Sequence, residues 1–354
     1  MIAVTFAGVR QVEIAEVDDP IITTSDDAIV EVDVAGLCGS DLHPWFGREV
    51  GLDRGTVLGH EFVGCVVEVG TAVTGLKVGD RVVAPFSTSC GDCFFCRSGL
   101  TARCVRGQLF GWVEQGEGLH GAQAQRVRVP LASSTLVAVP EAIDDDAVAL
   151  LAGDILSTAL FGAKLARVAP GDTVVIVGCG PVGLLAVRAA LAREAAQVIA
   201  VDPVPSRRAA AERWGALPLD PSASAEAMDR VRELTEGRGA DAAIEAVGSP
   251  EATRIAADLL RPGGRLAAVG VHTEPSLALT PGELYDRNLS YAAGRCPARH
   301  FMPGALELAQ HNQSLLAELI THRLPLTAAP DAYRRFAERE PGMHKVVFQP
   351  GKDA

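Results

Sequence analysis

The chain of 354 residues is long enough for two domains with separate hydrophobic cores. Hydrophobic residues make up 48% of it and charged residues 21%, which is the ordinary balance of a globular protein. The formal net charge of −12 excludes the broad basic surface with which proteins bind nucleic acid or anionic membranes.

The N-terminal part of the chain has the pattern of a mostly β domain. Residues 1–17 alternate like a strand and lack the basic start and long apolar run of a signal peptide. Further short strands are expected at residues 28–37, 61–70 and 80–86, separated by glycine and aspartate turns. The longest apolar run, residues 174–187, contains glycine and proline and is too short to span a bilayer. We therefore expect a cytoplasmic protein with no membrane span.

After about residue 147 the pattern alternates between strands and helices. This alternation predicts a parallel sheet built from βαβ units, with residues 220–228 as its most loop-like segment. The expected strands are residues 173–178, 197–202, 241–248 and 264–271, and the expected helices are residues 181–193, 206–216 and about 249–260.

Near the end of the chain the regular alternation of strands and helices stops. After about residue 295 the chain returns to short helices, and it ends in a strand-like run at residues 344–350. We therefore expect an α/β domain, residues 155–294, to be inserted between two parts of the mostly β domain, residues 1–154 and 295–354.

Four cysteines lie close together in the pattern C-x2-C-x2-C-x7-C, namely Cys90, Cys93, Cys96 and Cys104. Short loops with this spacing can fold four thiolates around one Zn²⁺. Two disulfides and an iron–sulfur cluster are the alternatives. Zinc is favoured, because a chain without a secretory signal stays in a compartment where thiols are reduced. Three isolated cysteines are expected to be buried filler, namely Cys65, Cys179 and Cys296.

A glycine-rich loop follows one predicted strand and opens the next predicted helix. Its residues are Gly178, Cys179, Gly180, Pro181, Val182 and Gly183. This is the G-x-G-x-x-G pattern in the context that dinucleotide binding requires, with the pyrophosphate at the helix N-terminus. Asp202 ends the following strand, where its carboxylate can accept hydrogen bonds from a ribose diol and favours NAD(H). Arg207 and Arg208 lie nearby and leave NADP(H) as the alternative. Gly270 and Val271 end a later strand, where backbone can lie near the nicotinamide.

A second candidate metal site has ligands scattered along the chain. A catalytic zinc takes three protein ligands and keeps one position open. Cys38 and His60 suit two of these positions, and Asp154 is the candidate for the third. A carboxylate in the apolar stretch around residue 154 is costly to bury unless it is paired or bound to metal. The alternative for Asp154 is the N-cap of the helix that follows.

Taken together, these motifs resemble the zinc-dependent medium-chain alcohol dehydrogenases over essentially the whole chain. The resemblance includes the run Gly59-His60-Glu61-x-x-Gly64 and the run from Val78 to Val82. It implies a GroES-like, mostly β catalytic domain with a structural zinc lobe at about residues 88–106. It also implies a Rossmann coenzyme domain with a doubly wound parallel sheet.

The resemblance implies roles for individual residues. Cys38, His60 and Asp154 would be the catalytic zinc ligands, and Asp41 would orient His60 through its other ring nitrogen. Glu61 would lie close to the metal. Ser40 would contact the substrate oxygen, and His43 would exchange the proton with solvent. The implied enzyme holds two Zn²⁺ per subunit and transfers a hydride between an alcohol and NAD(H), or reduces an aldehyde or ketone. A homotetramer or homodimer is expected.

Several features depart from the best-studied branch of the family. That branch has cysteine where this chain has Asp154, and the aspartate resembles the formaldehyde dehydrogenases, although their extra loop is missing. A polyol or sugar dehydrogenase, a zinc-free quinone reductase and a non-enzymatic dinucleotide sensor are competing functions.

Trp45 and Phe46 either line an apolar substrate pocket or pack within their loop. Gly39 replaces an arginine that contacts the cofactor phosphates in some relatives, and Lys345 or Arg295 would supply that charge instead.

Overall fold

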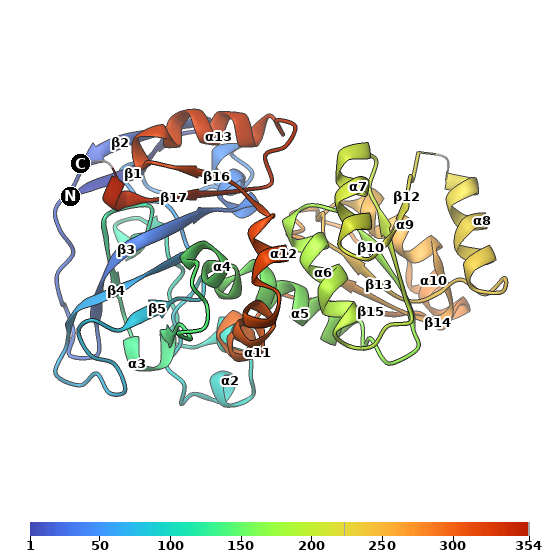
Figure 1. Ribbon diagram of the computed structural model, residues 1–354, viewed down its shortest axis with the longest axis horizontal. Helices are drawn as coiled ribbons and strands as arrows, with labels where there is room; N and C mark the ends of the chain where they lie inside the picture. Colours follow the sequence, from blue (N-terminus) through green and yellow to red (C-terminus); the bar gives the residue numbers. More distant parts are fainter. Residues whose placement is uncertain (223, 353–354) are drawn as a thin grey trace. The chain divides into compact units, whose positions relative to one another are not determined.

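The computed structural model describes residues 1–222 and 224–352. The chain forms two compact units, which are described separately below (Figure 1). The first unit consists of Met1–Ser157 together with the segment that begins at Pro297. The second consists of Thr158–Cys296. The chain therefore leaves the first unit once and returns to it once.

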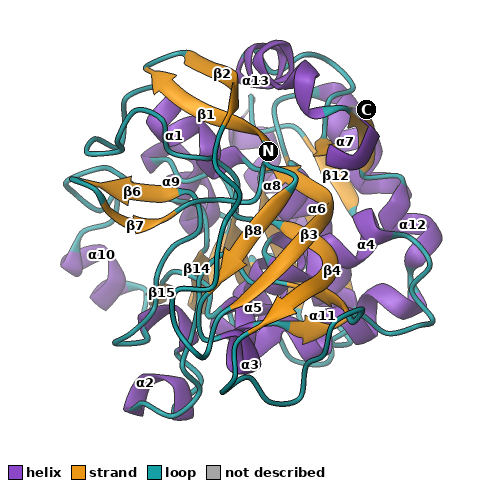
Figure 2. Ribbon diagram, turned by 90° about the vertical axis from the view of Figure 1, so that its left-hand side faces the viewer, coloured by secondary structure: helices purple, strands orange, loops and turns teal. Residues whose placement is uncertain are grey.

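The first unit is built around a seven-stranded sheet. Its order is β16-β17-β3-β4-β5-β9, and β8 pairs with β3 outside this path. Figure 2 shows β8, β3 and β4 side by side. The strands of this unit are β1 (Ile2–Gly8), β2 (Gln11–Glu16), β3 (Ala28–Leu37), β4 (Phe62–Val69), β5 (Arg81–Val83), β6 (Trp112–Glu114), β7 (Glu117–Leu119), β8 (Arg126–Val129), β9 (Val137–Ala138), β16 (Ile320–Leu324) and β17 (Lys345–Phe348).

Short helices fill the connections of the first unit. They are α1 (Leu42–Trp45), α2 (Phe94–Arg97), α3 (Ala132–Thr135), α4 (Asp146–Leu150), α11 (Ala298–His311), α12 (Gln313–Ala317) and α13 (Ala329–Ala337). The helix α5 (Ile155–Leu165) begins at the end of the unit's first segment. Figures 1 and 2 both show α13 beside the β1–β2 hairpin. Its Tyr333 packs there in an apolar core with Val4, Trp45 and Phe348.

The alternation in the sequence explains the central strand of this sheet. In β3 the side chains of Val30, Val32 and Val34 are buried, while Glu31 and Asp33 between them are exposed. Valine is favoured in strands, and the alternation places the charges on one face and the core on the other. The register of β3 follows from this burial, because a shift by one residue would bury the charges.

The second unit is a parallel sheet of six strands in the order β12-β11-β10-β13-β14-β15. Figure 1 shows α6 and α7 on one side of this sheet and α9 on the other. The strands are β10 (Thr173–Val177), β11 (Gln197–Val201), β12 (Leu217–Leu219), β13 (Ala240–Glu245), β14 (Leu260–Ala268) and β15 (Ser290–Ala293). The helices are α6 (Pro181–Leu191), α7 (Pro205–Arg213), α8 (Ser224–Leu234), α9 (Pro250–Asp258) and α10 (Pro281–Asp286). Strands covered on both faces are apolar along their whole length, as β10 is.

These two units confirm the expected fold class. A mostly β domain and a doubly wound α/β domain are the GroES-like and Rossmann architectures.

The prediction of a loop at residues 220–228 is wrong from Ser224 onward, where α8 begins, and residue 223 lies outside the described residues. Alanine, glutamate and methionine in this segment are good helix formers, which outweigh the serines. The prediction of a buried Cys65 is also wrong, because its side chain is only half-buried in β4.

In the described part of the chain, no single helix is long and apolar enough to cross a membrane. One bent pair, Asp146–Gly153 with Ile155–Leu165, meets the criteria of length and composition only when its two parts are counted together.

Candidate metal centres and coenzyme site

The end of β3 and the start of β4 bring two of the predicted ligands together. The two strands are antiparallel neighbours, and Ala35 faces Phe62 in their register. Cys38 directly follows β3 and His60 lies just before β4, so both leave the sheet at the same edge. The backbone N–H of Gly36 donates to the carbonyl of Glu61 at 2.9 Å, which continues the pairing toward the two side chains.

Asp154 completes this group from a third segment. It lies between a short 3-10 turn, Leu151–Gly153, and the start of α5. Its Oδ2 is 3.4 Å from Cys38 Sγ and 3.4 Å from His60 Nε2. One potential ligand atom from each of the three residues lies within 4.8 Å of the others. The turn can approach β5 this closely because Gly153 has no side chain. A Cβ there would lie 2.2 Å from the Ala84 carbonyl oxygen.

The electrostatics of this group call for a cation. Burial raises the pKa of the Cys38 thiol, and the carboxylate of Asp154 raises it further. Burial also lowers the pKa of the His60 ring, but Asp41 and Asp154 outweigh burial and hold that pKa well above its usual range. A thiolate, an imidazole and a carboxylate are all ligands of Zn²⁺. A bound Zn²⁺ would replace the protons that these residues otherwise share, so the donor set fits the metal.

Asp41 fixes the orientation of His60 through Nδ1, the ring nitrogen that faces away from Cys38 and Asp154. Asp41 Oδ1 is 3.2 Å from His60 Nδ1, and its Oδ2 accepts a hydrogen bond from the backbone N–H of Cys38 at 2.8 Å. A carboxylate on Nδ1 keeps the proton on that nitrogen, so the lone pair of Nε2 faces the metal position. The same carboxylate thus holds both ligand segments.

The two residues expected to move the proton lie in the turn after Cys38. Ser40 Oγ is 3.2 Å from His60 Nε2, at the edge of the ligand group. His43 has a buried Nδ1 that finds no hydrogen-bond partner among the described residues. Burial lowers the pKa of His43, so the ring is neutral at neutral pH and can accept a proton. The described residues show no direct hydrogen bond between Ser40 and His43.

The four clustered cysteines form a separate group in the first unit, made up of Cys90, Cys93, Cys96 and Cys104. All four are free thiols, which excludes the two-disulfide alternative in this structure. The Sγ atoms of Cys90 and Cys96 are 3.9 Å apart. Backbone N–H groups point at the sulfurs, and that of Cys93 lies 3.3 Å from Cys90 Sγ. Such donors favour thiolates, and the N–H of Cys96 helps to lower the pKa of Cys93 to about 6. Burial acts in the opposite direction at two of the others: it raises the pKa of Cys90, and it raises that of Cys96 to about 12.

The glycine loop of the second unit has the geometry that phosphate binding needs. Gly178 has φ +94°, a conformation that glycine adopts without strain. A Cβ on Gly183 would lie 1.7 Å from the Gly178 carbonyl oxygen, so only glycine lets α6 start this close to β10. Gly180 is the N-cap of α6 and Pro181 is its first residue, which leaves the helix N-terminus open toward the loop.

Asp202 is held against the same loop. Its side chain is buried and accepts hydrogen bonds from the backbone N–H of Cys179 at 2.9 Å and of Val204 at 2.8 Å. Arg207 approaches the same carboxylate at 3.8 Å. Arg208 instead donates to the carbonyl of Asp202 and pairs with Asp220. Asp202 and Arg207 therefore lie beside the glycine loop, as the sequence predicts.

The ends of β13 and β14 also approach each other closely. A Cβ on Gly270 would lie 2.1 Å from the backbone nitrogen of Gly248, so this position requires glycine. Val271 follows with its side chain 47% exposed, at the carboxyl edge of the sheet where dinucleotides bind. Glu245 is fully buried beneath this segment and contacts His272 Nε2 at 2.9 Å.

Comparison with known proteins gives the family. Residues 24–141 match the model of the alcohol dehydrogenase GroES-like domain, and residues 181–311 match the model of the zinc-binding dehydrogenases. Zinc-type alcohol dehydrogenase B of Aspergillus flavus is 41% identical over 99% of this chain and 82% of its own length. This chain belongs to the zinc-dependent alcohol dehydrogenases. It is therefore an oxidoreductase that acts on small-molecule alcohols, as expected.

Two further relatives agree with this assignment. A zinc-type alcohol dehydrogenase-like protein of Bacillus subtilis, AdhB, is 35% identical over 99% of this chain and 100% of its own. The alcohol dehydrogenase of Thermus sp. ATN1 has a TM-score of 0.92 at 36% identity, and the match covers 99% of both chains. The family also agrees with the GroES-like and Rossmann domains seen in the fold.

The sequence did not show that this dehydrogenase pairs Glu61 with Lys345. Lys345 begins β17, whose Val346 faces Leu37 of β3. Its ammonium donates to Glu61 Oε2 and, at 3.2 Å, to the carbonyl of Leu37. The prediction that Lys345 reaches a cofactor phosphate is therefore wrong, because this side chain is buried and already paired. Arg295 is exposed, and its role as a phosphate contact stays a prediction.

Trp45 and Phe46 follow the packing alternative rather than the pocket alternative. Trp45 is 7% exposed and packs in the apolar core with its ring centroid 5.6 Å from that of Tyr333. Phe46 packs against the same core and lies beneath the guanidinium groups of Arg10 and Arg48, at 5.8 and 4.9 Å. The contacts of both rings therefore favour the packing alternative.

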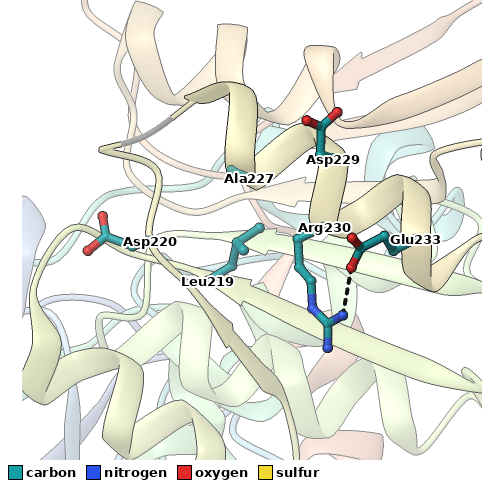
Figure 3. Close-up of a pocket in the computed structure, with 6 residues that line it drawn as sticks. All are labelled: Leu219, Asp220, Ala227, Asp229, Arg230 and Glu233. Carbon is teal, nitrogen blue, oxygen red and sulfur yellow. Dashed lines mark hydrogen bonds and ion pairs between the residues drawn. The ribbon is translucent and has the colours of Figure 1, made fainter.

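A hollow in the coenzyme unit lies next to Asp202, whose backbone N–H donates to the carbonyl of Leu219 at 3.3 Å (Figure 3). It is lined by Leu219, Asp220, Ala227, Asp229, Arg230 and Glu233. Arg230 and Glu233 pair at 2.9 Å, one turn apart on α8. Its lining has three carboxylates and includes none of the glycine-loop residues, and the chemistry derived below does not use it.

Proposed function

We propose that this enzyme oxidises small-molecule alcohols with NAD⁺ and holds two Zn²⁺ per subunit. The observation that carries the proposal is the buried group of Cys38, His60 and Asp154, with Asp41 on the second nitrogen of the imidazole. The four-cysteine lobe would hold the second Zn²⁺, because four thiolates leave no open position for a substrate. The free state of all the cysteines supports a reducing compartment such as the cytoplasm.

Different residues of the site would have different roles in the reaction. Zn²⁺ at the Cys38 group would act as a Lewis acid that lowers the pKa of the alcohol hydroxyl. Ser40 Oγ lies beside the ligand group and would accept the hydroxyl proton while it passes its own proton on. His43, kept neutral by burial, would take up that proton on its way to solvent. Glu61 would contribute a negative charge next to His60. Gly178 to Gly183, Gly270 and Val271 would hold the dinucleotide.

A panel of alcohols assayed by the rise in NADH absorbance, with metal analysis of the same enzyme, tests the proposal. The panel includes primary, secondary and polyhydric alcohols as well as formaldehyde with glutathione. Turnover with NAD⁺ and two zinc ions per chain would support it. A zinc-free active enzyme, or bound dinucleotide without any turnover, would contradict it. Light scattering on the same sample tests the proposed homotetramer or homodimer.

Asp202→Ala is expected to reduce the preference for NAD⁺ over NADP⁺. A charge-assisted hydrogen bond from the ribose is worth about 1.5–3 kcal/mol, so the ratio of the two kcat/KM values should fall about 10- to 100-fold. The ratio is the informative quantity, because Asp202 also holds the backbone of Cys179 and its loss weakens both cofactors. Asp229→Ala removes an exposed carboxylate from the same unit and should leave the ratio unchanged. A wild-type enzyme that already prefers NADP⁺ would refute the assignment.

Cys90→Ser is expected to remove the lobe zinc and lower thermal stability before it affects the hydride step. Binding of a structural zinc contributes directly to folding, whereas the Cys38 group belongs to another segment. We expect one zinc per chain, a lower unfolding temperature and a kcat per folded enzyme close to that of the wild type. Cys65→Ser, at a half-buried cysteine outside both groups, is the control. A stable Cys90→Ser enzyme with no activity would contradict this division of roles.

A further inference from the structure

We infer that Gln123 and Tyr333 are positioning residues that hold the Cys38 and His60 segments in register for the metal, an inference that rests on the function proposed above. Gln123 lies in the loop before β8, and Tyr333 lies in α13 near the C-terminus. Both side chains are fully buried. Neither belongs to a motif of the sequence, and 210 residues separate them along the chain.

Gln123 contacts the backbone next to both ligands. Its own N–H donates to the carbonyl of Leu58 at 2.8 Å, and the N–H of Ala122 donates to that of Gly59 at 2.9 Å. A Cβ on Gly59, the residue before His60, would lie 2.4 Å from Gln123 Cγ. From this position Gln123 Nε2 donates to the carbonyl of Gly36 at 3.0 Å, two residues before Cys38. One buried amide therefore bridges the two ligand segments.

The carbonyl of Gly36, which can only accept, fixes which way round that amide lies, and Tyr333 anchors the other end of it. The hydroxyl of Tyr333 donates to Gln123 Oε1 at 2.8 Å. The nitrogen end of the amide faces Gly36, whose carbonyl needs a donor, and Oε1 therefore needs the donor that the Tyr333 hydroxyl supplies. The reversed amide would place two oxygens against each other in a buried site, which is costly. The ring of Tyr333 is itself fixed by packing against Trp45.

This arrangement constrains the end of β3 from two sides. Gly36 donates its N–H to the carbonyl of Glu61 and accepts from Gln123 through its own carbonyl. Metal ligands have to be held to within about 0.5 Å, and buried hydrogen bonds behind them provide that precision. An apolar side chain at position 123 would fill the same space without specifying how far Gly36 lies from Gly59.

Release of zinc from the holoenzyme to a coloured chelator tests the inference. We expect the wild-type enzyme to release zinc in two phases, one from the four-cysteine lobe and one from the catalytic site. The phase that is missing in Cys90→Ser belongs to the lobe, and the phase that is missing in Asp154→Ala belongs to the catalytic site. Tyr333→Phe removes one hydroxyl and keeps the ring, and we expect it to speed the catalytic phase about ten-fold and leave the lobe phase unchanged. Tyr285→Phe, at a side chain that is 87% exposed, is the matched control and should alter neither phase.

A double variant tests whether Tyr333 acts through Gln123. Gln123→Leu is expected to speed catalytic zinc release at least as much as Tyr333→Phe, and adding Tyr333→Phe to it should speed release no further. Unchanged release in Tyr333→Phe would overturn the inference, and so would equal acceleration of both phases, which indicates general destabilisation. A wild-type enzyme without a catalytic phase would instead refute the proposed zinc site itself. If Gln123→Leu does not fold, the result for Tyr333→Phe decides alone.

Discussion

Asp154→Ala is expected to abolish alcohol oxidation and to remove the catalytic zinc while the lobe zinc stays bound. The carboxylate is one of three proposed ligands in a buried group, and its Oδ2 lies 3.4 Å from both Cys38 Sγ and His60 Nε2. Lewis-acid catalysis supplies several kcal/mol of transition-state stabilisation, so kcat/KM should fall about a thousand-fold or more. Steady-state kinetics together with the zinc content per chain measure both effects.

The choice of replacement separates the role of the ligand from that of the local structure. Asp154→Asn keeps the shape but loses the charge, and should behave like Asp154→Ala. Asp154→Cys restores an anionic zinc ligand, so it should bind zinc again and recover part of the activity. Asp144→Ala removes an exposed carboxylate from a nearby turn and is the control. Wild-type kcat with two zinc ions in Asp154→Ala would show that the third ligand lies elsewhere.

The grouping of Cys38, His60 and Asp154 could be predicted from the sequence because each of these proposed ligands carries a local signal. Cys38 and His60 lie in glycine-containing turns after and before periodic strands, and adjacent antiparallel strands bring such turns together. Asp154 was visible as a single charge within an apolar stretch. Strand β10 and helix α6 were equally clear, since a continuous apolar run and a glycine loop specify them. Helix α8 was missed because its serines suggested a turn.

The residues behind the ligands could not be predicted in this way. Lys345 meets Glu61 across 284 positions, and Tyr333 meets Gln123 across 210. These partners depend on the C-terminal strand β17 returning beside β3 and on α13 packing next to it. A buried lysine or tyrosine has no sequence pattern of its own, because its partner is fixed by the topology of the sheet. A buried lysine in a C-terminal strand, such as Lys345 in β17, is therefore a reason to look for an acidic partner such as Glu61 near the functional site.

Lys345→Met is expected to destabilise the catalytic unit severely. Glu61 is fully buried, and its Oε1 has no hydrogen-bond partner among the described residues, so losing Lys345 leaves an unpaired buried carboxylate. Removing one member of a buried ion pair costs about 3–5 kcal/mol. For a unit of this size that corresponds to a decrease of roughly 10 °C in the unfolding temperature, measured by calorimetry. Lys77→Met, at an exposed lysine, is the control and should change it little.

The double variant Glu61→Gln/Lys345→Met distinguishes the two roles of this pair. With the charge of Glu61 removed as well, the penalty of an unpaired buried charge disappears, and the unfolding temperature should recover most of its loss. If the pair served stability alone, kcat would recover with it. Glu61 also places a negative charge beside His60, however, and Lys345 holds the carbonyl of Leu37, the residue before Cys38. We therefore expect the double variant to be stable but about ten-fold or more slower than the wild type. A stable double variant with wild-type kcat would assign Glu61 to the core and remove it from the catalytic machinery.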